Sequence, residues 1–197
     1  MKYYLDITLL PDAEANLGFL WQKVYQQIHI ALAENKIADN QSAIAVSFPK
    51  YGDKDFPLGD KLRLFAELQS ELEEFNVSKW LNRLTDYVHM TSIKAVPSTV
   101  NEYACFKRKQ FKSNLMKAAE RRAKFKGESL AVALAHFKDY QKETSLPFIN
   151  MMSLSMQENT YYNRNFKLFI ERTAADVLIQ GDFNCYGLSK GATIPCF

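Results

Sequence analysis

The first half of the chain alternates between two kinds of apolar periodicity, and their order restricts the fold more than any other feature. Tyr3–Leu10 repeats its apolar residues at every second position, as a strand with one buried face does. Leu17–Leu32 repeats them at the helical spacing, in a stripe made of Leu17, Leu20, Trp21, Val24, Ile28 and Leu32. The patterns that follow are strand-like, strand-like, helical and strand-like, at Ala43–Phe48, Leu62–Ala66, Gln69–Tyr87 and Val88–Val96. The order β-α-β-β-α-β predicts a ferredoxin-like domain, with its second helix interrupted near Asn76.

The second half has a different organisation. Pro97, Ser98 and Thr99 resemble a short linker, so we expect one domain over residues 1–97 and another over residues 98–197. The second domain is expected to contain a basic extended segment, two helices separated by Gly127, and strands, at Glu102–Phe111, Asn114–Phe125, Ser129–Lys142, Leu146–Met156, Asn165–Glu171 and Asp176–Tyr186. The predicted fold class is therefore α+β.

Positive charge is concentrated in one short segment. The net charge of +3 divides into −3 over residues 1–100 and +6 over residues 101–197. Residues 107–126 alone carry nine Lys and Arg side chains and a single acidic residue, Glu120. A surface that only keeps a protein soluble spreads its charges, whereas such a cluster is typical of a protein that binds a polyanion. The charge pattern therefore indicates a nucleic-acid partner.

Composition excludes several other classes of protein. With 47% hydrophobic and 24% charged residues, and with few Gly and Pro, the chain has the composition of an ordinary globular protein. No apolar run approaches the roughly 20 residues of a membrane span, and the amino terminus alternates where a signal peptide would be continuously apolar. We therefore expect a soluble, cytoplasmic protein with no membrane partner. The three cysteines form no Cys-x-x-Cys pair, so neither a disulfide framework nor a metal site is expected.

His29 lies on the first helix. At about 100° per residue it flanks the apolar stripe and is not part of it, so we expect it at the edge of a cleft. No two of the three histidines have the spacing of metal ligands. Spacing alone favours an ordinary, partly buried histidine over a catalytic one.

The helix predicted at Asn114–Phe125 has two different faces. Lys117, Arg121 and Lys124 are spaced i, i+4 and i+7, within about 60° of one another. A solvated face usually alternates Glu with Lys, and here only Glu120 does so. We therefore predict a nucleic-acid contact, with a solvated face as the alternative. The opposite stripe is apolar and consists of Leu115, Met116, Ala119 and Ala123. Several aromatic residues lie among the charged residues of the second half, where they could stack on bases or belong to the core: Tyr103, Phe106, Phe111, Tyr161, Tyr162 and Phe166.

Two segments have some features of catalytic motifs. Ser153 and Ser155 are two positions apart in a predicted strand and therefore share one face. The chain contains no Gly-x-Ser-x-Gly elbow, which argues against a Ser/His/Asp hydrolase. Tyr186–Gly191 contains glycines as a phosphate-binding loop does, but it lacks the P-loop pattern, so a nucleotide site is poorly supported.

Several blocks of sequence also occur in a distinctive order and spacing. They are YLDI at Tyr4–Ile7, the helix that carries His29, VSFP at Val46–Pro49, LPF at Leu146–Phe148, FKLFI at Phe166–Ile170 and CYGLSKG at Cys185–Gly191. Together they resemble the CRISPR repeat-processing endoribonucleases of type I-F systems, the Csy family. The resemblance runs over most of the chain.

The resemblance implies roles for individual residues. By position, His29 matches the family's catalytic histidine and Ser153 its catalytic serine, and Tyr186 matches a tyrosine that orients the site. Arg108 and Gln110 match two residues that read bases at the foot of a hairpin, and Phe166 matches an aromatic residue that stacks under its terminal base pair. Ser155 lies beside the catalytic serine. The implied RNA-binding residues also include the basic residues Lys107, Lys109, Lys112, Lys117, Arg121, Arg122 and Lys124.

One segment departs from the family pattern. The best-known members have an arginine-rich helix, whereas here Ala118, Ala119, Glu120 and Phe125 interrupt it and lysines replace several arginines. Lysine cannot grip a phosphate with two parallel hydrogen bonds as arginine does, so this helix is expected to bind its hairpin more loosely or to depend on the lysines at positions 107, 109 and 112.

The expected activity is a metal-independent endoribonuclease with no cofactor. It would bind the hairpin of CRISPR repeat RNA and cleave at the 3′ foot by attack of a 2′-OH, giving mature crRNA with 2′,3′-cyclic phosphate and 5′-OH ends. Because RNA supplies this nucleophile, no metal is needed to activate water. The expected partners are the repeat RNA and other CRISPR-associated proteins of a type I-F surveillance complex. A non-catalytic hairpin-binding subunit and a protein-docking assembly subunit are the alternatives.

Overall fold

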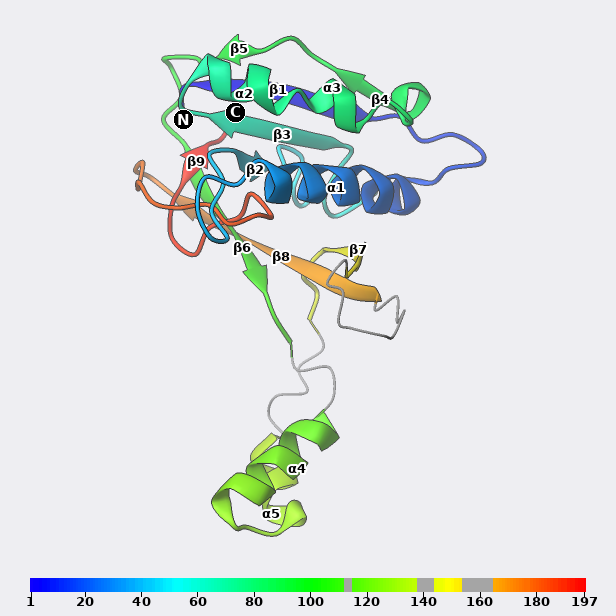
Figure 1. Cartoon of the computed structure of the whole chain (residues 1–197), viewed down its shortest axis with the longest axis vertical. Helices are drawn as coiled ribbons and strands as arrows, with labels where there is room; N and C mark the ends of the chain where they lie inside the picture. Colours follow the sequence, from blue (N-terminus) through cyan, green and yellow to red (C-terminus); the bar gives the residue numbers. More distant parts are fainter. Residues whose placement is uncertain (112–114, 138–143, 154–164) are drawn as a thin grey trace. The chain divides into compact units, whose positions relative to one another are not determined.

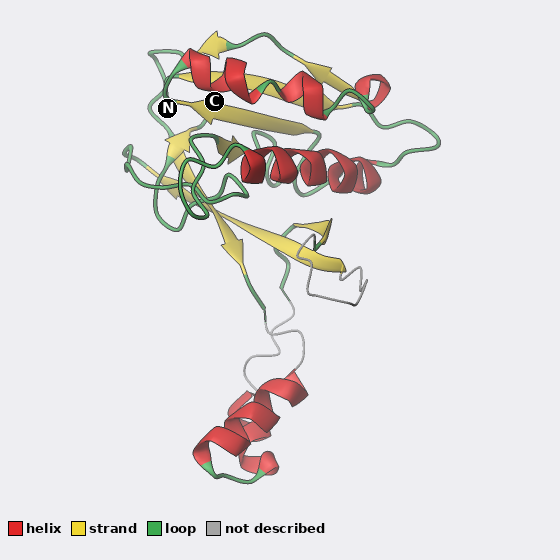
Figure 2. Cartoon of the chain, viewed as in Figure 1, coloured by secondary structure: helices red, strands yellow, loops and turns green. Residues whose placement is uncertain are grey.

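A computed structural model of the chain describes residues 1–111, 115–137, 144–153 and 165–197 (Figure 1). Helices and antiparallel sheets occur together, so the fold class is α+β (Figure 2). Contacts within the chain define two compact units, Met1–Arg108 with Pro147–Phe197, and Lys109–Leu146. The domain boundary predicted at residue 97 lies inside the first of these units. No helix among the described residues has both the length and the apolar composition to cross a membrane.

The first sheet consists of the amino-terminal strands. They are β1 (Tyr3–Leu9), β2 (Ala45–Ser47), β3 (Lys61–Ala66), β4 (Val88–Met90) and β5 (Lys94–Ala95). The order is β2-β3-β1-β4, with β5 also paired to β1, and all these pairs are antiparallel. The alternating apolar residues predicted for β1 are buried at Leu5, Ile7 and Leu9. The strand predicted at Val88–Val96 is two short strands, β4 and β5.

The helices of the first half agree with their predicted positions. They are α1 (Leu17–Glu34), α2 (Gln69–Phe75), α3 (Val77–Trp80) and the 3₁₀ helix η1 (Thr85–Tyr87). The side chain of Asn16 caps α1 by accepting a hydrogen bond from the Phe19 N–H at 3.0 Å. Asn76, at φ 45°, separates α2 from α3, which confirms the predicted interruption. Asparagine tolerates this left-handed conformation better than most residues do.

The second sheet has the order β7-β8-β6-β9. Its strands are β6 (Tyr103–Lys109), β7 (Phe148–Met152), β8 (Asn165–Ala175) and β9 (Ile194–Pro195). The strand predicted at Asp176–Tyr186 is wrong, because this segment is a loop with one isolated bridge, between Phe183 and Ser42. The N–H of Ile179 donates to the side-chain hydroxyl of Thr193 at 2.7 Å, and the carbonyl of Ile179 accepts a hydrogen bond from the N–H of Thr193 at 2.9 Å.

The smaller unit contains a helical hairpin. Its helices are α4 (Leu115–Lys126) and α5 (Leu130–Phe137), and Gly127 between them has φ +66°, as expected of a glycine that ends a helix. Ala119 and Ala133 are completely buried where the two helices meet. The Arg122 side chain contacts Glu128 at 2.6 Å. Residues 138–142, predicted to continue the second helix, lie outside the described residues.

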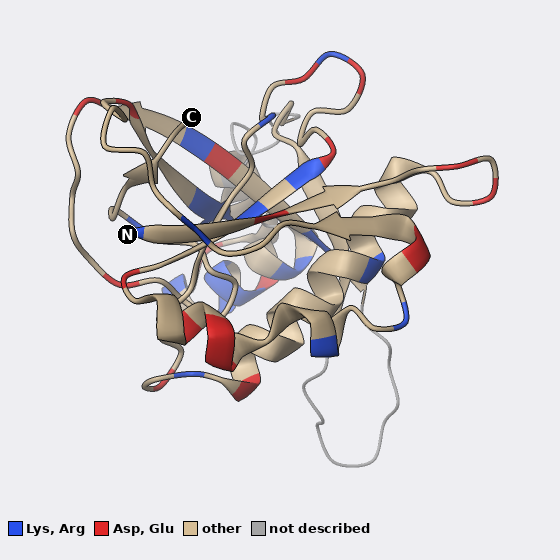
Figure 3. Ribbon diagram, turned by 90° about the horizontal axis from the view of Figure 1, so that it is seen from above, with Lys and Arg blue, Asp and Glu red and all other residues tan. Residues whose placement is uncertain are grey.

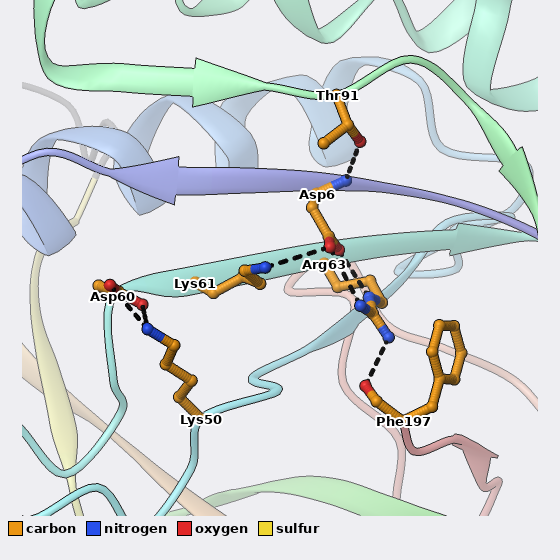
Figure 4. A network of polar contacts seen from close by, with 7 residues as sticks. All are labelled: Asp6, Lys50, Asp60, Lys61, Arg63, Thr91 and Phe197. Carbon is orange, nitrogen blue, oxygen red and sulfur yellow. Dashed lines mark hydrogen bonds and ion pairs between the residues drawn. The ribbon is translucent and has the colours of Figure 1, made fainter.

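A buried ion pair joins the first sheet to the end of the chain (Figure 4). Arg63 on β3 donates two hydrogen bonds to Asp6 on β1, at 2.6 and 3.0 Å, and a third to the carbonyl of Phe197 at 2.9 Å. Lys61 is 3.5 Å from the same carboxylate. Because every charge in this network has partners, removing one of them would leave an uncompensated buried charge.

Candidate active site

His29 is half-buried on α1, beside the residues that face the first sheet. Its Nδ1 lies 2.8 Å from the backbone carbonyl oxygen of Cys185. A carbonyl oxygen only accepts hydrogen bonds, so Nδ1 must carry the proton and donate it. In the neutral ring the lone pair therefore belongs to Nε2, which is the atom that can act as a base.

Tyr186 holds the imidazole from one face. The rings of His29 and Tyr186 are stacked, with centroids 4.0 Å apart and planes 6° from parallel. The carbonyl of Tyr186 accepts a hydrogen bond at 2.8 Å from the hydroxyl of Tyr25, a fully buried residue one turn before His29 on α1. The backbone N–H of Tyr186 donates to the side chain of Asn184 at 2.8 Å. Helix and turn thus fix both rings relative to each other.

The turn that carries Tyr186 depends on Gly187. Its φ is +68°, and its carbonyl accepts a hydrogen bond from the Val46 N–H of β2 at 2.8 Å. A Cβ at this position would lie 2.3 Å from Cγ2 of Val46. Only glycine combines this conformation with so close an approach to the neighbouring strand.

Arg108 and Phe166 lie next to this stack. The guanidinium carbon of Arg108, on β6, is 4.8 Å from the ring centroid of Tyr186 and 5.3 Å from that of Phe166, on β8. Both distances are within the range of a cation–π contact. The structure thus brings together four residues that lie far apart in the sequence and to which the family resemblance assigns functional roles.

Burial and charge act on the imidazole of His29 in the same direction. Burial lowers the pKa of His29 below its ordinary value, and the positive charge of Arg108 lowers it further, against the opposing effect of the hydrogen bond to Cys185. The neutral ring, which has a lone pair on Nε2, is therefore favoured at neutral pH.

Ser153 directly follows β7 and is half-buried. The preceding residue, Met152, makes two backbone hydrogen bonds with the side chain of Gln26 on α1, at 2.9 and 3.3 Å. Sequence analysis missed Gln26, because it lies about 160° around the helix from Ile28 of the apolar stripe. It is buried because β7 covers this second side of α1.

The other predicted RNA-binding residues are distributed over both units. Lys107 is half-buried, whereas Lys109 and Gln110 are exposed at and just beyond the end of β6. Lys117, Arg121 and Lys124 on the basic face of α4 are exposed. Figure 3 colours all Lys and Arg positions of the chain blue. Arg122 is engaged by Glu128, while Lys112 and Ser155 lie outside the described residues.

The described part of the chain offers no ready metal site. Within it, no three His, Cys, Asp or Glu side chains lie together in a way that could hold a metal ion. All three cysteines are free thiols, and the two buried ones, Cys105 and Cys185, have pKa values raised by burial. The site described above consists of an oriented imidazole beside aromatic and cationic groups.

Comparison with known proteins gives full-length matches. The model of the family described as CRISPR-associated protein (Cas_Csy4) matches residues 4–197. The chain is 36% identical over 203 residues to a protein of Escherichia coli (strain UTI89 / UPEC) named CRISPR-associated endonuclease Cas6/Csy4. It is 31% identical over 199 residues to a protein of Pseudomonas aeruginosa (strain UCBPP-PA14) with the same name. Each match covers 100% of both chains. A solved structure described as "An RAMP protein binding different RNA substrates" covers 100% of both chains at 13% identity, with a TM-score of 0.36, which is too low to establish a common fold.

Proposed function

Because the chain belongs to the Cas_Csy4 family of CRISPR-associated proteins, we propose that it is the endoribonuclease that processes CRISPR repeat RNA. Both relatives are named endonucleases and match from end to end, so the activity in their names applies to a chain of the same extent. The proposed substrate is the hairpin of the repeat RNA. The proposed cut lies at the 3′ foot of this hairpin and releases mature crRNA.

The orientation of His29 carries the mechanistic part of the proposal. Its Nδ1 donates to the Cys185 carbonyl and its ring is stacked on Tyr186, so Nε2 is the basic atom and is held in place. Nε2 takes the proton of the ribose 2′-OH, and the 2′-oxygen attacks the adjacent phosphorus. The bond from phosphorus to the 5′-oxygen breaks, and this oxygen leaves as a 5′-OH after it takes up a proton. The other product ends in a 2′,3′-cyclic phosphate.

Ser153 and Tyr186 have supporting roles in this mechanism. The hydroxyl of Ser153 holds the 2′-oxygen, and Tyr186 orients His29 through ring stacking. Alignment of the 2′-oxygen with phosphorus is as important as proton removal, because an intramolecular attack is fast only in a near-attack geometry. Since the nucleophile belongs to the RNA, the reaction needs no metal-bound water.

Arg108 links recognition of the hairpin to the reacting phosphate. Its guanidinium lies next to Tyr186 and Phe166, and arginine reads a guanine edge with two hydrogen bonds. Gln110 reads the neighbouring base, and Phe166 stacks under the terminal base pair. The foot of the hairpin then lies beside His29. Phosphate contacts come from the basic residues of the Lys109–Leu146 unit and of β6: Lys107, Lys109, Lys112, Lys117, Arg121, Arg122 and Lys124.

We further propose that residues 1–97 form a ferredoxin-like domain and residues 98–197 the RNA-binding part. The strand order β2-β3-β1-β4 with antiparallel neighbours, and the helices between β1 and β2 and between β3 and β4, support the first assignment. The family supports a further proposal, that the protein works in the cytoplasm with other CRISPR-associated proteins of a type I-F surveillance complex.

Cleavage of a labelled repeat hairpin tests the proposed activity. Wild-type protein should cut it equally in a chelator and in magnesium. His29→Ala should be slower by about 10²–10⁴-fold, with hairpin affinity within a few-fold of wild type. The matched control is His89→Ala, which changes an exposed histidine on β4 and should cut at the wild-type rate.

Three results would contradict parts of the proposal. Loss of cutting in the chelator would mean that a metal takes part. Binding without cutting would make the chain a hairpin-binding subunit, and the absence of RNA binding would indicate an assembly subunit.

A further inference from the structure

Gln26 is a buried amide that the mechanism above does not use. Its residue is only 5% exposed. Its Oε1 accepts a hydrogen bond from the Met152 N–H at 2.9 Å, and its Nε2 donates one to the Met152 carbonyl at 3.3 Å. A side chain that satisfies both polar groups of one backbone residue does what a neighbouring strand would do.

β7 requires such a partner because it is an edge strand. In the order β7-β8-β6-β9, one side of β7 pairs with β8 and the other side has no strand among the described residues. Backbone groups on a free edge are satisfied only by water or by other parts of the protein. The amide of Gln26 therefore attaches the last residue of β7 to α1.

The attachment point is close to both groups proposed for catalysis. Gln26 precedes His29 by three residues, a rise of about 4.5 Å along the helix. Met152 is bonded directly to Ser153, so their Cα atoms are about 3.8 Å apart. One amide thus links the helix segment that carries His29 to the backbone that carries Ser153.

We propose that Gln26 is a positioning residue for RNA cleavage, which holds Ser153 at a fixed place relative to His29. This inference rests on the proposed function, because it requires that both residues serve one reaction. Without the amide, the end of β7 can move away from α1, while the imidazole of His29 keeps its own contacts with the Cys185 carbonyl and the Tyr186 ring. A misplacement of about 1 Å in an active site can cost about 10²-fold in rate.

The test compares Gln26→Met with Gln27→Met. Methionine keeps the length of glutamine and a good helix propensity but makes neither hydrogen bond. Gln27 is the next residue on α1, is half-buried, and its side chain makes no hydrogen bond with any described residue. With RNA at saturation, Gln26→Met should cut about 10–100-fold more slowly than Gln27→Met. Both should bind the hairpin with a Kd within a few-fold of wild type.

A double-mutant cycle separates positioning from general damage. If the amide acts through the serine, Gln26→Met should slow the Ser153→Ala protein by less than about two-fold, because there is no hydroxyl left to misplace. Gln26→Glu against Gln27→Glu gives a second comparison, should Gln26→Met fail to fold. The glutamate keeps an oxygen for the Met152 N–H but cannot donate to the carbonyl, so it should also cut more slowly than its control.

The possible outcomes are distinguishable. Equal rates for Gln26→Met and Gln27→Met, or for the two glutamate variants if methionine unfolds the protein, would overturn the role of Gln26 alone. A full additional loss in the Ser153→Ala background would also overturn it, since the amide would then act by another route. A wild-type protein that does not cut the hairpin would overturn the proposed function, and this inference with it.

Discussion

Replacing Gly187 by alanine should destabilise the unit that carries the site and weaken the hold on His29. Two costs add at this position. A non-glycine residue at φ +68° costs about 1–2 kcal/mol, and overpacking a close-packed contact costs about 1–3 kcal/mol. The new Cβ would lie 2.3 Å from Cγ2 and 2.8 Å from Cβ of Val46, so either the turn or β2 must move. The expected decrease in free energy of unfolding is about 2–5 kcal/mol.

Gly52→Ala is the matched control for the conformational cost. Gly52 belongs to the same compact unit and has φ +92°, but a Cβ there would meet nothing within 4 Å. It should show only the backbone cost, about 1–2 kcal/mol. The difference between the two variants, about 1–3 kcal/mol, is the steric contribution of Val46.

Urea unfolding followed by tryptophan fluorescence measures both variants, because Trp21 and Trp80 lie in this unit. Gly187→Ala should have the lower midpoint at an unchanged slope. The cleavage rate per folded molecule should also be lower than in the wild type, because the same turn supplies the Cys185 carbonyl and the Tyr186 ring that contact His29. Equal midpoints for Gly187→Ala and Gly52→Ala would refute the close approach to Val46.

Three further predictions concern the site and the basic helix. The kcat/KM for cleavage should rise with pH and reach half its plateau below about pH 6.5, because burial lowers the pKa of His29 and only the neutral ring accepts a proton. In Arg108→Gln this rise should move to higher pH, because a charge that lowers the pKa of His29 is removed. An unchanged pH profile in this variant would contradict the electrostatic effect of Arg108. Tyr186→Phe should cut at nearly the wild-type rate and Tyr186→Ala much more slowly, because the ring makes the contact with His29; equal decreases in rate would assign the role to the hydroxyl. The variant in which Lys117, Arg121 and Lys124 on α4 are all replaced by alanine should bind the hairpin more weakly. The slope of log K against log salt concentration should decrease in magnitude by up to about 0.9 for each phosphate that the variant no longer neutralises. Unchanged binding would show that this face is only solvated.

Local periodicity was sufficient to predict the elements that build the first unit. The apolar stripe of α1, the alternation of β1 and the interruption at Asn76 each depend on residues within a few positions of one another. The position of His29 beside the stripe follows from the same helical geometry. Local periodicity left its function undecided, and it was the resemblance to the Csy family that matched His29, Ser153 and Tyr186 to a catalytic set.

Contacts between distant segments explain what local patterns could not predict. The hydrogen bond from His29 to Cys185 joins residues 156 positions apart, and no spacing rule connects them. Gln26 lies on the polar side of α1 and is buried only because β7 packs there. Residues 176–186 contain three consecutive apolar residues typical of a strand, Val177, Leu178 and Ile179, yet these are 46–60% exposed and none of them belongs to a strand.

A hairpin with one 2′-deoxy sugar at the cleavage position tests the nucleophile most directly. The substitution removes a single oxygen from the RNA and leaves the protein and its phosphate contacts unchanged. Wild-type protein should bind this hairpin with the same Kd as the all-ribose hairpin and leave it intact, in a chelator and in magnesium alike, because His29 then has no 2′-OH to deprotonate. If the deoxy hairpin is cut in either condition, the nucleophile is water, and the role assigned to Nε2 of His29 is wrong.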